Sequence, residues 1–189
     1  DGCFRVFAIT AHRNLPLAVQ QARRFRPQLL VATDPRLAGD GQRRSVVPLR
    51  RALRRDGRLR FNFAGDGNCS HFLKVGRRAM ALDAFTPCFA DFPWPWYMPG
   101  IDEYASLVGR TGLCHTRVWG EKADRFFPDV EAMVGWVDQP CLVPFLACIP
   151  AEQRPSFRDV VVKRMIEETR QEDGRCFETF RRINVSARK

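Results

Sequence analysis

The sequence predicts a protein of the α/β class, in which strands alternate with helices. Three observations lead to this prediction. Short segments rich in β-branched and aromatic residues are separated by longer segments with apolar residues at helical spacing. The first segments follow one another as strand, helix and strand within about 30 residues, which is typical of a βαβ unit. The chain also ends on a strand and not on a helix.

The predicted βαβ unit consists of two strands and the helix between them. Residues 4–10 are rich in β-branched and aromatic side chains, which indicates a buried strand. Asn14 is expected to cap the helix that follows, and Pro16 falls in its first turn, where a missing N–H costs little. Residues 28–33 form the second expected strand. The crossover between these strands should be right-handed.

A polar, turn-rich segment at residues 35–45 is the expected junction between two parts of the chain. It separates a βαβ fragment at residues 1–45 from a larger part at residues 46–189. The larger part opens with a short basic helix at residues 46–55. A strand follows at residues 59–64, because apolar residues alternate there with period two. We expect the βαβ unit to lie beside this strand in one sheet.

The middle of the chain holds a segment that is dense in aromatic residues and prolines. Residues 85–99 contain six aromatic residues and four prolines, so neither a regular helix nor a central strand is expected there. We expect this segment to form an irregular aromatic cover. The other elements expected after residue 65 are helices at 71–82, 102–112 (capped by Asp102), 130–136, 142–149 and 157–171, and strands at 113–119 and 176–187.

The net charge of +10 is carried entirely by the first third of the chain. Residues 1–60 hold 14 arginines against 4 acidic residues, whereas residues 61–189 are neutral overall. A basic surface attracts nucleic acid. However, the basic residues are nearly all arginine, and few aromatic residues accompany them for base stacking. Nucleic acid is therefore not an expected partner.

Cysteine and histidine patterns predict neither a metal site nor a thiol catalyst. None of the seven cysteines forms a CxxC pair, which favours reduced thiols in the cytoplasm. His12, His71 and His115 lie far apart in sequence. Cys69 and Cys88 have no nearby histidine and carboxylate pattern, so no catalytic residue is assigned.

The chain opens with neither a methionine nor a basic leader, and no apolar run approaches the length of a membrane span, so neither a signal peptide nor a membrane partner is expected.

Four segments of the larger part resemble one known family. They are LRRALRRDGRLRFNFAG at residues 49–65, PWYMPGIDEYASLVGRTGL at 95–113, VWGEKADRFFPDVEAMVGWVDQPCLVPFL at 118–146 and DGRCFETFRRINVSARK at 173–189. In order and spacing they resemble the C-terminal half of a class I S-adenosylmethionine-dependent methyltransferase of the trans-aconitate methyltransferase-like group. The resemblance implies that these segments contain the fifth strand, the approach to the sixth strand, the cap helices and the closing strand.

This resemblance implies S-adenosylmethionine as cofactor and a small organic acid as substrate. Asp66 and Asn68 follow the expected fifth strand, where open α/β sheets place ligands, and are the candidate cofactor-binding residues. A carboxylate acceptor needs a clamp and no general base, and a guanidinium is a natural clamp. Arg181 and Arg182 would point to opposite faces of the last strand, and Arg181 is favoured. The aromatic residues expected to line the acceptor pocket are Trp94, Trp96, Tyr97 and Trp136.

Residues 4–36 resemble a different family. The stretch FRVFAITAHRNLPLAVQQARRFRPQLLVATDP is similar to the NADPH-binding domain of 1-deoxy-D-xylulose 5-phosphate reductoisomerase. The resemblance implies that His12, Arg13 and Asn14 contact NADPH, with Arg13 at the 2′-phosphate. His12 stands where that family has glycine, and the family's GSTGSIG loop is absent.

The sequence therefore predicts an incomplete Rossmann-like sheet, mostly parallel with an antiparallel final strand, and a helical and aromatic cap insertion. The leading interpretation of the sequence is a methyltransferase-like protein. We expect it to be inactive if its donor site is incomplete. Two alternatives stay open at this point. One is an NADPH-binding oxidoreductase fragment, and the other is a non-catalytic remnant of a fusion between two enzymes.

Overall fold

The structure is a computed structural model that describes residues 8–11, 15–32 and 50–189. The chain folds into two compact units, each assembled from segments that are distant in sequence. The sheet unit contains the described residues up to Asp66 together with residues 96–122 and 181–189. The helical unit contains residues 67–95 and 123–180. The predicted junction at residues 35–45, with the domain boundary at its end, lies outside the described residues.

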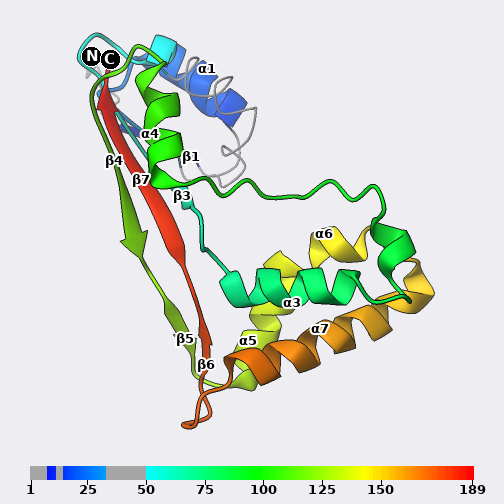
Figure 1. The fold of residues 1–189 in the computed structure, drawn as a ribbon. Helices are drawn as coiled ribbons and strands as arrows, with labels where there is room; N and C mark the ends of the chain where they lie inside the picture. Colours follow the sequence, from blue (N-terminus) through cyan, green and yellow to red (C-terminus); the bar gives the residue numbers. More distant parts are fainter. Residues whose placement is uncertain (1–7, 12–14, 33–49) are drawn as a thin grey trace, which may run out of the picture. The chain divides into compact units, whose positions relative to one another are not determined.

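A five-stranded sheet forms the centre of the sheet unit (Figure 1). Its strands are β1 (Ala8–Ala11), β2 (Leu29–Ala32), β3 (Arg58–Ala64), β4 (Cys114–Lys122) and β7 (Arg181–Arg188). Their order across the sheet is β1-β2-β3-β7-β4. β1, β2 and β3 run parallel, whereas β7 runs antiparallel to both of its neighbours. The predicted fold class is confirmed, and so is the position of the βαβ unit beside the strand at residues 59–64.

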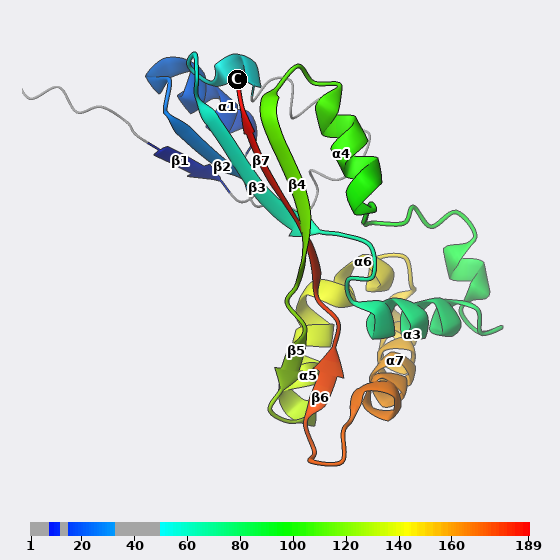
Figure 2. The same cartoon turned by 60° about the vertical axis from the view of Figure 1, so that its left-hand side comes forward.

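Alternation along the strands gives the sheet a covered face and an open face. On β3, Leu59, Phe61 and Phe63 are buried, whereas Arg58 and Arg60 are exposed. The buried residues share one hydrophobic core with residues of α1 (Leu15–Phe25) and α4 (Ile101–Gly109). Figures 1 and 2 show both helices on the same side of the sheet. The described helices of this unit therefore cover one face only.

The helical unit is built around an aromatic cluster. Its helical elements are α3 (Ser70–Met80), η2 (Thr86–Phe89), α5 (Val130–Trp136), η3 (Val137–Cys141), α6 (Val143–Leu146), η4 (Ala151–Gln153) and α7 (Arg154–Thr169). Two short antiparallel strands, β5 (Arg125–Phe127) and β6 (Cys176–Glu178), form a separate sheet. Phe145 is buried, with its ring centre 5.1 Å from that of Phe92 and 5.8 Å from that of Phe72.

The predicted last strand at residues 176–187 is wrong as a single element. It divides into β6 and β7, which belong to different sheets. The division occurs because the backbone groups of residues 179 and 180 form hydrogen bonds with partners that are not in a paired strand. The Thr179 carbonyl accepts from the Cys69 amide at 2.8 Å, and the Phe180 amide donates to the Asp124 carboxylate at 3.0 Å.

The start of α4 also differs from the prediction. Gly100 is the N-cap residue, and Asp102 lies within the first turn of the helix. A carboxylate in the first turn still stabilises a helix, because it faces the positive end of the helix dipole. β4 continues three residues past the predicted end at Trp119, since its pairing with β7 extends to Lys122.

Candidate functional site

A hollow of about 400 Å³ lies at the carboxyl ends of β3 and β4. β7 begins at the same place because it runs antiparallel to both strands. The residues that line the hollow are Gly65, Asp66, Pro99, Gly100, Ile101, Gly120, Glu121, Lys122, Arg181, Arg182 and Ile183. Open α/β sheets bind ligands outside the carboxyl ends of their strands. We call this feature the strand-end hollow.

Three cationic residues line the strand-end hollow: Lys122 and Arg181 from the covered face of the sheet, and Arg182 from its open face. Asp66 and Glu121 contribute the two carboxylates. Glu121 is already engaged, because its Oε2 accepts from the Asn184 side-chain amide at 2.8 Å. Asp66 is exposed, and its backbone amide donates to the Pro99 carbonyl at 2.9 Å. Cations thus outnumber carboxylates at the hollow, which favours an anionic ligand.

A row of polar side chains across three strands holds Arg182 in place. Arg182 Nε donates to Asn62 Oδ1 at 2.6 Å, and Asn62 Nδ2 donates to Asn184 Oδ1 at 3.0 Å. Asn184 then donates to Glu121. These residues share the open face of the sheet, because Asn62 pairs with Asn184 and Glu121 pairs with Arg182 in the strand register. The Arg182 guanidinium is therefore fixed by the protein itself.

Two isoleucines form an apolar floor under the charged rim. A Cβ atom added to Gly65 would come within 2.7 Å of Ile183 Cγ1, and one added to Gly120 would come within 2.7 Å of Ile101 Cδ1. Glycine at position 65 leaves room for the buried Ile183, and glycine at position 120 leaves room for the tip of Ile101. The strand-end hollow thus combines an apolar floor with a charged rim.

The structure brings only part of the predicted site together. Asp66 and Arg181 both line the strand-end hollow. Tyr97 belongs to the same unit, packs against the sheet core and donates a hydrogen bond to Glu103. Trp96 is half-buried in that unit. His12, Arg13 and Asn14 lie outside the described residues.

The other predicted site residues belong to the helical unit. Trp94 lies under the Arg77 guanidinium, which is 4.7 Å from its ring centre. The ring centre of Trp136 lies 5.4 Å from that of Phe127 and 5.7 Å from that of Phe180. Asn68 is buried and donates to Cys69 Sγ at 3.0 Å. These side chains are part of the packing of that unit.

Sequence analysis missed Lys122, Glu121 and the two asparagines that fix Arg182. Extending the strand at residues 113–119 by three residues would have brought Glu121 and Lys122 to the sheet edge. The period-two pattern places Asn62 on the polar side of β3. Its partner Asn184 lies 122 residues away, and only the strand register joins them.

The start of α3 does not supply a cradle for an adenosyl or phosphate group. The one described strand that leads into a helix through a glycine-rich turn is β3, by way of residues 65–69 into α3. The start of α3 is filled by Glu178, whose buried carboxylate accepts from the amides of His71 at 3.2 Å and Phe72 at 2.9 Å. An internal carboxylate thus occupies the place where a helix start would bind an external anion.

The described residues contain neither a cluster of three potential metal ligands nor a helix long and apolar enough to cross a membrane. The Cys141 thiol is buried, and this burial raises its pKa far above the ordinary value of 9.0. A thiol held in its neutral form is a poor nucleophile.

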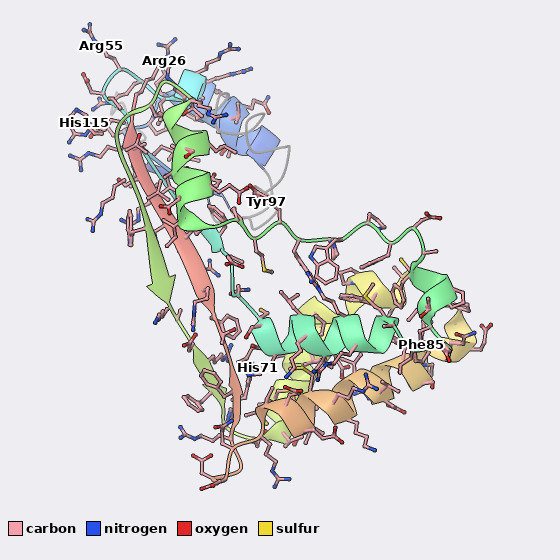
Figure 3. The ribbon with its side chains drawn as sticks, viewed as in Figure 1. Arg26, Arg55, His71, Phe85, Tyr97 and His115 are labelled. Atoms are coloured by element: carbon pink, nitrogen blue, oxygen red, sulfur yellow. The ribbon has the colours of Figure 1, made fainter. Side chains whose placement is uncertain are left out.

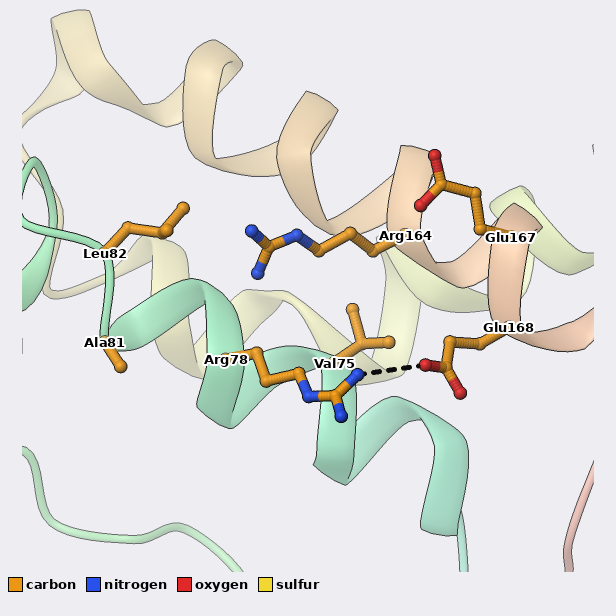
Figure 4. Close-up of a pocket in the computed structure, with 7 residues that line it drawn as sticks. All are labelled: Val75, Arg78, Ala81, Leu82, Arg164, Glu167 and Glu168. Atoms are coloured by element: carbon orange, nitrogen blue, oxygen red, sulfur yellow. Dashed lines mark hydrogen bonds and ion pairs between the residues drawn. The ribbon is translucent and has the colours of Figure 1, made fainter.

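A second hollow of about 500 Å³ lies between α3 and α7 in the helical unit (Figure 4). Glu168 on α7 pairs there with Lys74 at 2.6 Å and with Arg78 at 3.1 Å. The hydrogen bond from Lys74 lowers the pKa of the Glu168 carboxyl. Because these charges pair with one another across the two helices, this hollow belongs to helix packing.

No protein-family model and no curated protein sequence matches this chain. Similar solved structures include phosphoethanolamine N-methyltransferase 2 of Haemonchus contortus in complex with S-adenosyl-L-methionine, with 12% identity and a TM-score of 0.40. The match covers 86% of this chain and 33% of that one. YcgJ of Bacillus subtilis has 11% identity and a TM-score of 0.46, over 86% of this chain and 63% of that one. Coclaurine N-methyltransferase bound to N-methylheliamine and S-adenosylhomocysteine has 12% identity and a TM-score of 0.42, over 86% of this chain and 48% of that one. The chain thus spans between one third and two thirds of these proteins.

Proposed function

We propose that this chain is a methyltransferase-like protein of the S-adenosylmethionine-dependent class, and that its strand-end hollow binds the carboxylate of a small organic acceptor. One observation carries the proposal. Lys122 and Arg181 line a hollow at the carboxyl edge of the sheet, beside a floor of two isoleucines. A guanidinium binds a carboxylate through two parallel hydrogen bonds, which orient the acid as well as hold it.

The arrangement of the last strands supports the methyltransferase part of this proposal. The resemblance of residues 46–189 to that family designates a fifth strand, a sixth strand and a closing strand. In the structure these segments are β3, β4 and β7, and β7 pairs antiparallel with both of the others. The strand-end hollow lies where all three meet. Because Glu178 fills the start of α3, the role proposed for the strand-end hollow is to bind and orient the acceptor.

Calorimetry with trans-aconitate tests acceptor binding, with its uncharged trimethyl ester as the matched ligand. We expect the acid to bind and the ester not to bind. Arg181→Gln should weaken binding of the acid by about tenfold or more, because a charge-assisted hydrogen bond contributes roughly 1.5–3 kcal/mol. Arg110→Gln removes an exposed arginine at the end of α4 and should leave binding unchanged. Equal binding of acid and ester would overturn the proposed acceptor class.

Calorimetry with S-adenosylhomocysteine and with NADPH tests the class of protein. Binding of S-adenosylhomocysteine that becomes tighter in the presence of the acid would support a methyltransferase. Binding of the acid alone would leave a non-catalytic acid-binding domain. Binding of NADPH that Arg13→Ala weakens would favour the reductoisomerase-like alternative.

A further inference from the structure

The open face of the sheet carries a concentration of arginines that the proposed function does not use. Arg58 and Arg60 on β3, Arg117 on β4 and Arg188 on β7 are all exposed. The strand register places them in two adjacent rows, because Arg58 pairs with Arg188 while Arg60 and Arg117 both pair with Ser186. We call these four side chains the arginine face.

Two adjoining hollows run along the arginine face. One, of about 570 Å³, is lined by Arg58, Arg60, Arg117 and Arg188 together with His115, Trp119, Ser186 and Ala187. The other, of about 470 Å³, shares Arg58 and Arg188 with the first and adds Arg54. Asp56 is the one carboxylate among the lining residues of the two hollows. Figure 3 shows that Arg26, Arg55 and His115 lie at this same end of the unit.

Trp119 holds two of the four arginines in position. The Arg60 guanidinium lies 5.0 Å from the Trp119 ring centre, and that of Arg117 lies 4.8 Å from it. Arg60 reaches Trp119 across β7, where the intervening residue of its row is the small Ser186. Contact with an aromatic ring uses the flat side of a guanidinium and leaves its N–H groups available.

No carboxylate in the part of the chain that the structure describes forms an ion pair with Arg58, Arg60, Arg117 or Arg188. Like charges this close repel one another, and a ligand with several anionic groups removes that cost. Guanidinium N–H groups match phosphate oxygens in geometry and charge.

We infer that the arginine face binds single-stranded nucleic acid through its phosphates. Alternate residues of a strand are separated by about 6.8 Å, so the face presents cations in repeated rows, as a chain of phosphates requires. A flat sheet face is a known platform for single strands. The arginines come from both the basic and the neutral part of the sequence. For that reason, composition did not predict this partner.

Fluorescence anisotropy with a labelled 12-nucleotide single strand of mixed sequence tests the inference, with the same sequence as a duplex for comparison. We expect the single strand to bind more tightly than the duplex, with an affinity that falls as salt rises. Each phosphate contact on a single strand contributes about 0.7 to the slope of log affinity against log salt. The double variant Arg60→Ala/Arg117→Ala should therefore weaken binding by about tenfold or more and reduce the slope by about 1.4.

The matched control is Arg23→Ala/Arg24→Ala on α1. It removes the same charge from the same unit, and Arg24 also lies over an aromatic ring, that of Phe25 at 5.1 Å. We expect the control to retain wild-type affinity within about twofold. Trp119→Phe should bind better than Trp119→Leu, because phenylalanine keeps a ring beneath the two guanidinium groups. Circular dichroism confirms that each variant is folded.

Three results would overturn the inference. The first is the absence of binding to the single strand at low salt. The second is an equal loss in the Arg23/Arg24 control, which would show attraction to net charge alone. The third is tighter binding of the duplex than of the single strand. None of these results bears on acid binding at the strand-end hollow, which is lined by none of these arginines.

Discussion

The two units of the chain place their polar groups in opposite ways. In the helical unit, Glu178 is fully buried and accepts hydrogen bonds from the amides of His71, Phe72 and Thr179 at 3.2, 2.9 and 2.8 Å. In the sheet unit, the arginines of β3, β4 and β7 lie on an exposed face, and further cations surround the strand-end hollow. A polar group that is satisfied internally fixes the fold, whereas one that faces solvent can bind a ligand. This difference is the reason that both proposed binding sites lie in the sheet unit.

Arginines above aromatic rings occur in both units, and their charges are balanced differently. In the helical unit, Arg175 lies 4.5 Å from the Phe126 ring centre and pairs with Asp173 at 2.6 Å. In the sheet unit, Arg60 and Arg117 share Trp119 without a described carboxylate. Contact with a ring is therefore no sign of a site by itself. The arginine face is distinguished by two guanidinium groups that share one ring, with two further exposed arginines in the adjacent row.

The largest effect should come from the aromatic cluster of the helical unit. Phe145→Ala should lower the free energy of unfolding by about 3–5 kcal/mol, because it leaves a cavity among packed rings. Phe145 is 1% exposed and has the rings of Phe72, Phe92 and Phe157 around it. Urea unfolding followed by circular dichroism measures the loss. The control is Phe126→Ala, since Phe126 is 47% exposed, and it should cost about 1 kcal/mol or less. Similar losses in both variants would show that the cluster is not the core of this unit.

The next effect tests whether Glu178 is a structural group. Glu178→Ala should lower the free energy of unfolding by about 3 kcal/mol, because it leaves buried amides at the start of α3 without their acceptor. Glu178→Gln keeps one acceptor oxygen and should lose less. Glu172→Ala, at an exposed position, should change stability by no more than about 0.5 kcal/mol. If Glu178→Ala unfolds like the wild-type protein, this carboxylate is available for another role.

The sequence predicted the strands and their faces better than the sites. The period-two pattern of residues 59–64 correctly predicted Leu59, Phe61 and Phe63 as one buried row, because alternation is a local property. Glu178 fills the start of a helix that precedes it by more than 100 residues, and nothing local in the sequence indicates that contact. Asp66 and Arg181 were predicted separately, and the strand register brings them to the same hollow.

The arginine face shows the same limit. Arg58 and Arg60 belong to the basic first 60 residues, whereas Arg117 and Arg188 come from the neutral remainder. The distribution of charge along the sequence could not predict that these four arginines lie on one face, because β7 lies between β3 and β4 only in the folded sheet.

High pH should affect the two units through different residues. Burial raises the pKa of Cys141 in the helical unit above its ordinary value of 9.0, and that of Tyr104 in the sheet unit above 10.0. A group with a raised pKa in the folded state contributes stability below its unfolded pKa and loses it as pH rises. Unfolding free energy should therefore fall by about 1 kcal/mol between pH 9 and pH 10 through Cys141 alone, and further above pH 10 through Tyr104.

Urea unfolding of Cys141→Ala at several pH values measures this slope. The variant should be less stable than the wild-type protein at pH 8, and the difference should shrink by pH 10. Cys148→Ala, at an exposed position, should leave the pH profile unchanged. A constant difference between Cys141→Ala and wild type would contradict the prediction.

The smallest effect concerns two tyrosine hydroxyls of the sheet unit. The Tyr104 hydroxyl is buried and has no hydrogen-bond partner among the described residues, whereas Tyr97 donates to Glu103. Burying an unsatisfied hydroxyl costs free energy, so Tyr104→Phe should raise the free energy of unfolding by about 1 kcal/mol. Tyr97→Phe removes an exposed hydrogen bond and should lower it by about 1 kcal/mol or less. Phenylalanine keeps the packing of the Tyr104 ring against Phe63, whose centre lies 4.6 Å away, so the comparison isolates the hydroxyl. A loss of stability in Tyr104→Phe would show that this hydroxyl is hydrogen-bonded in the folded protein.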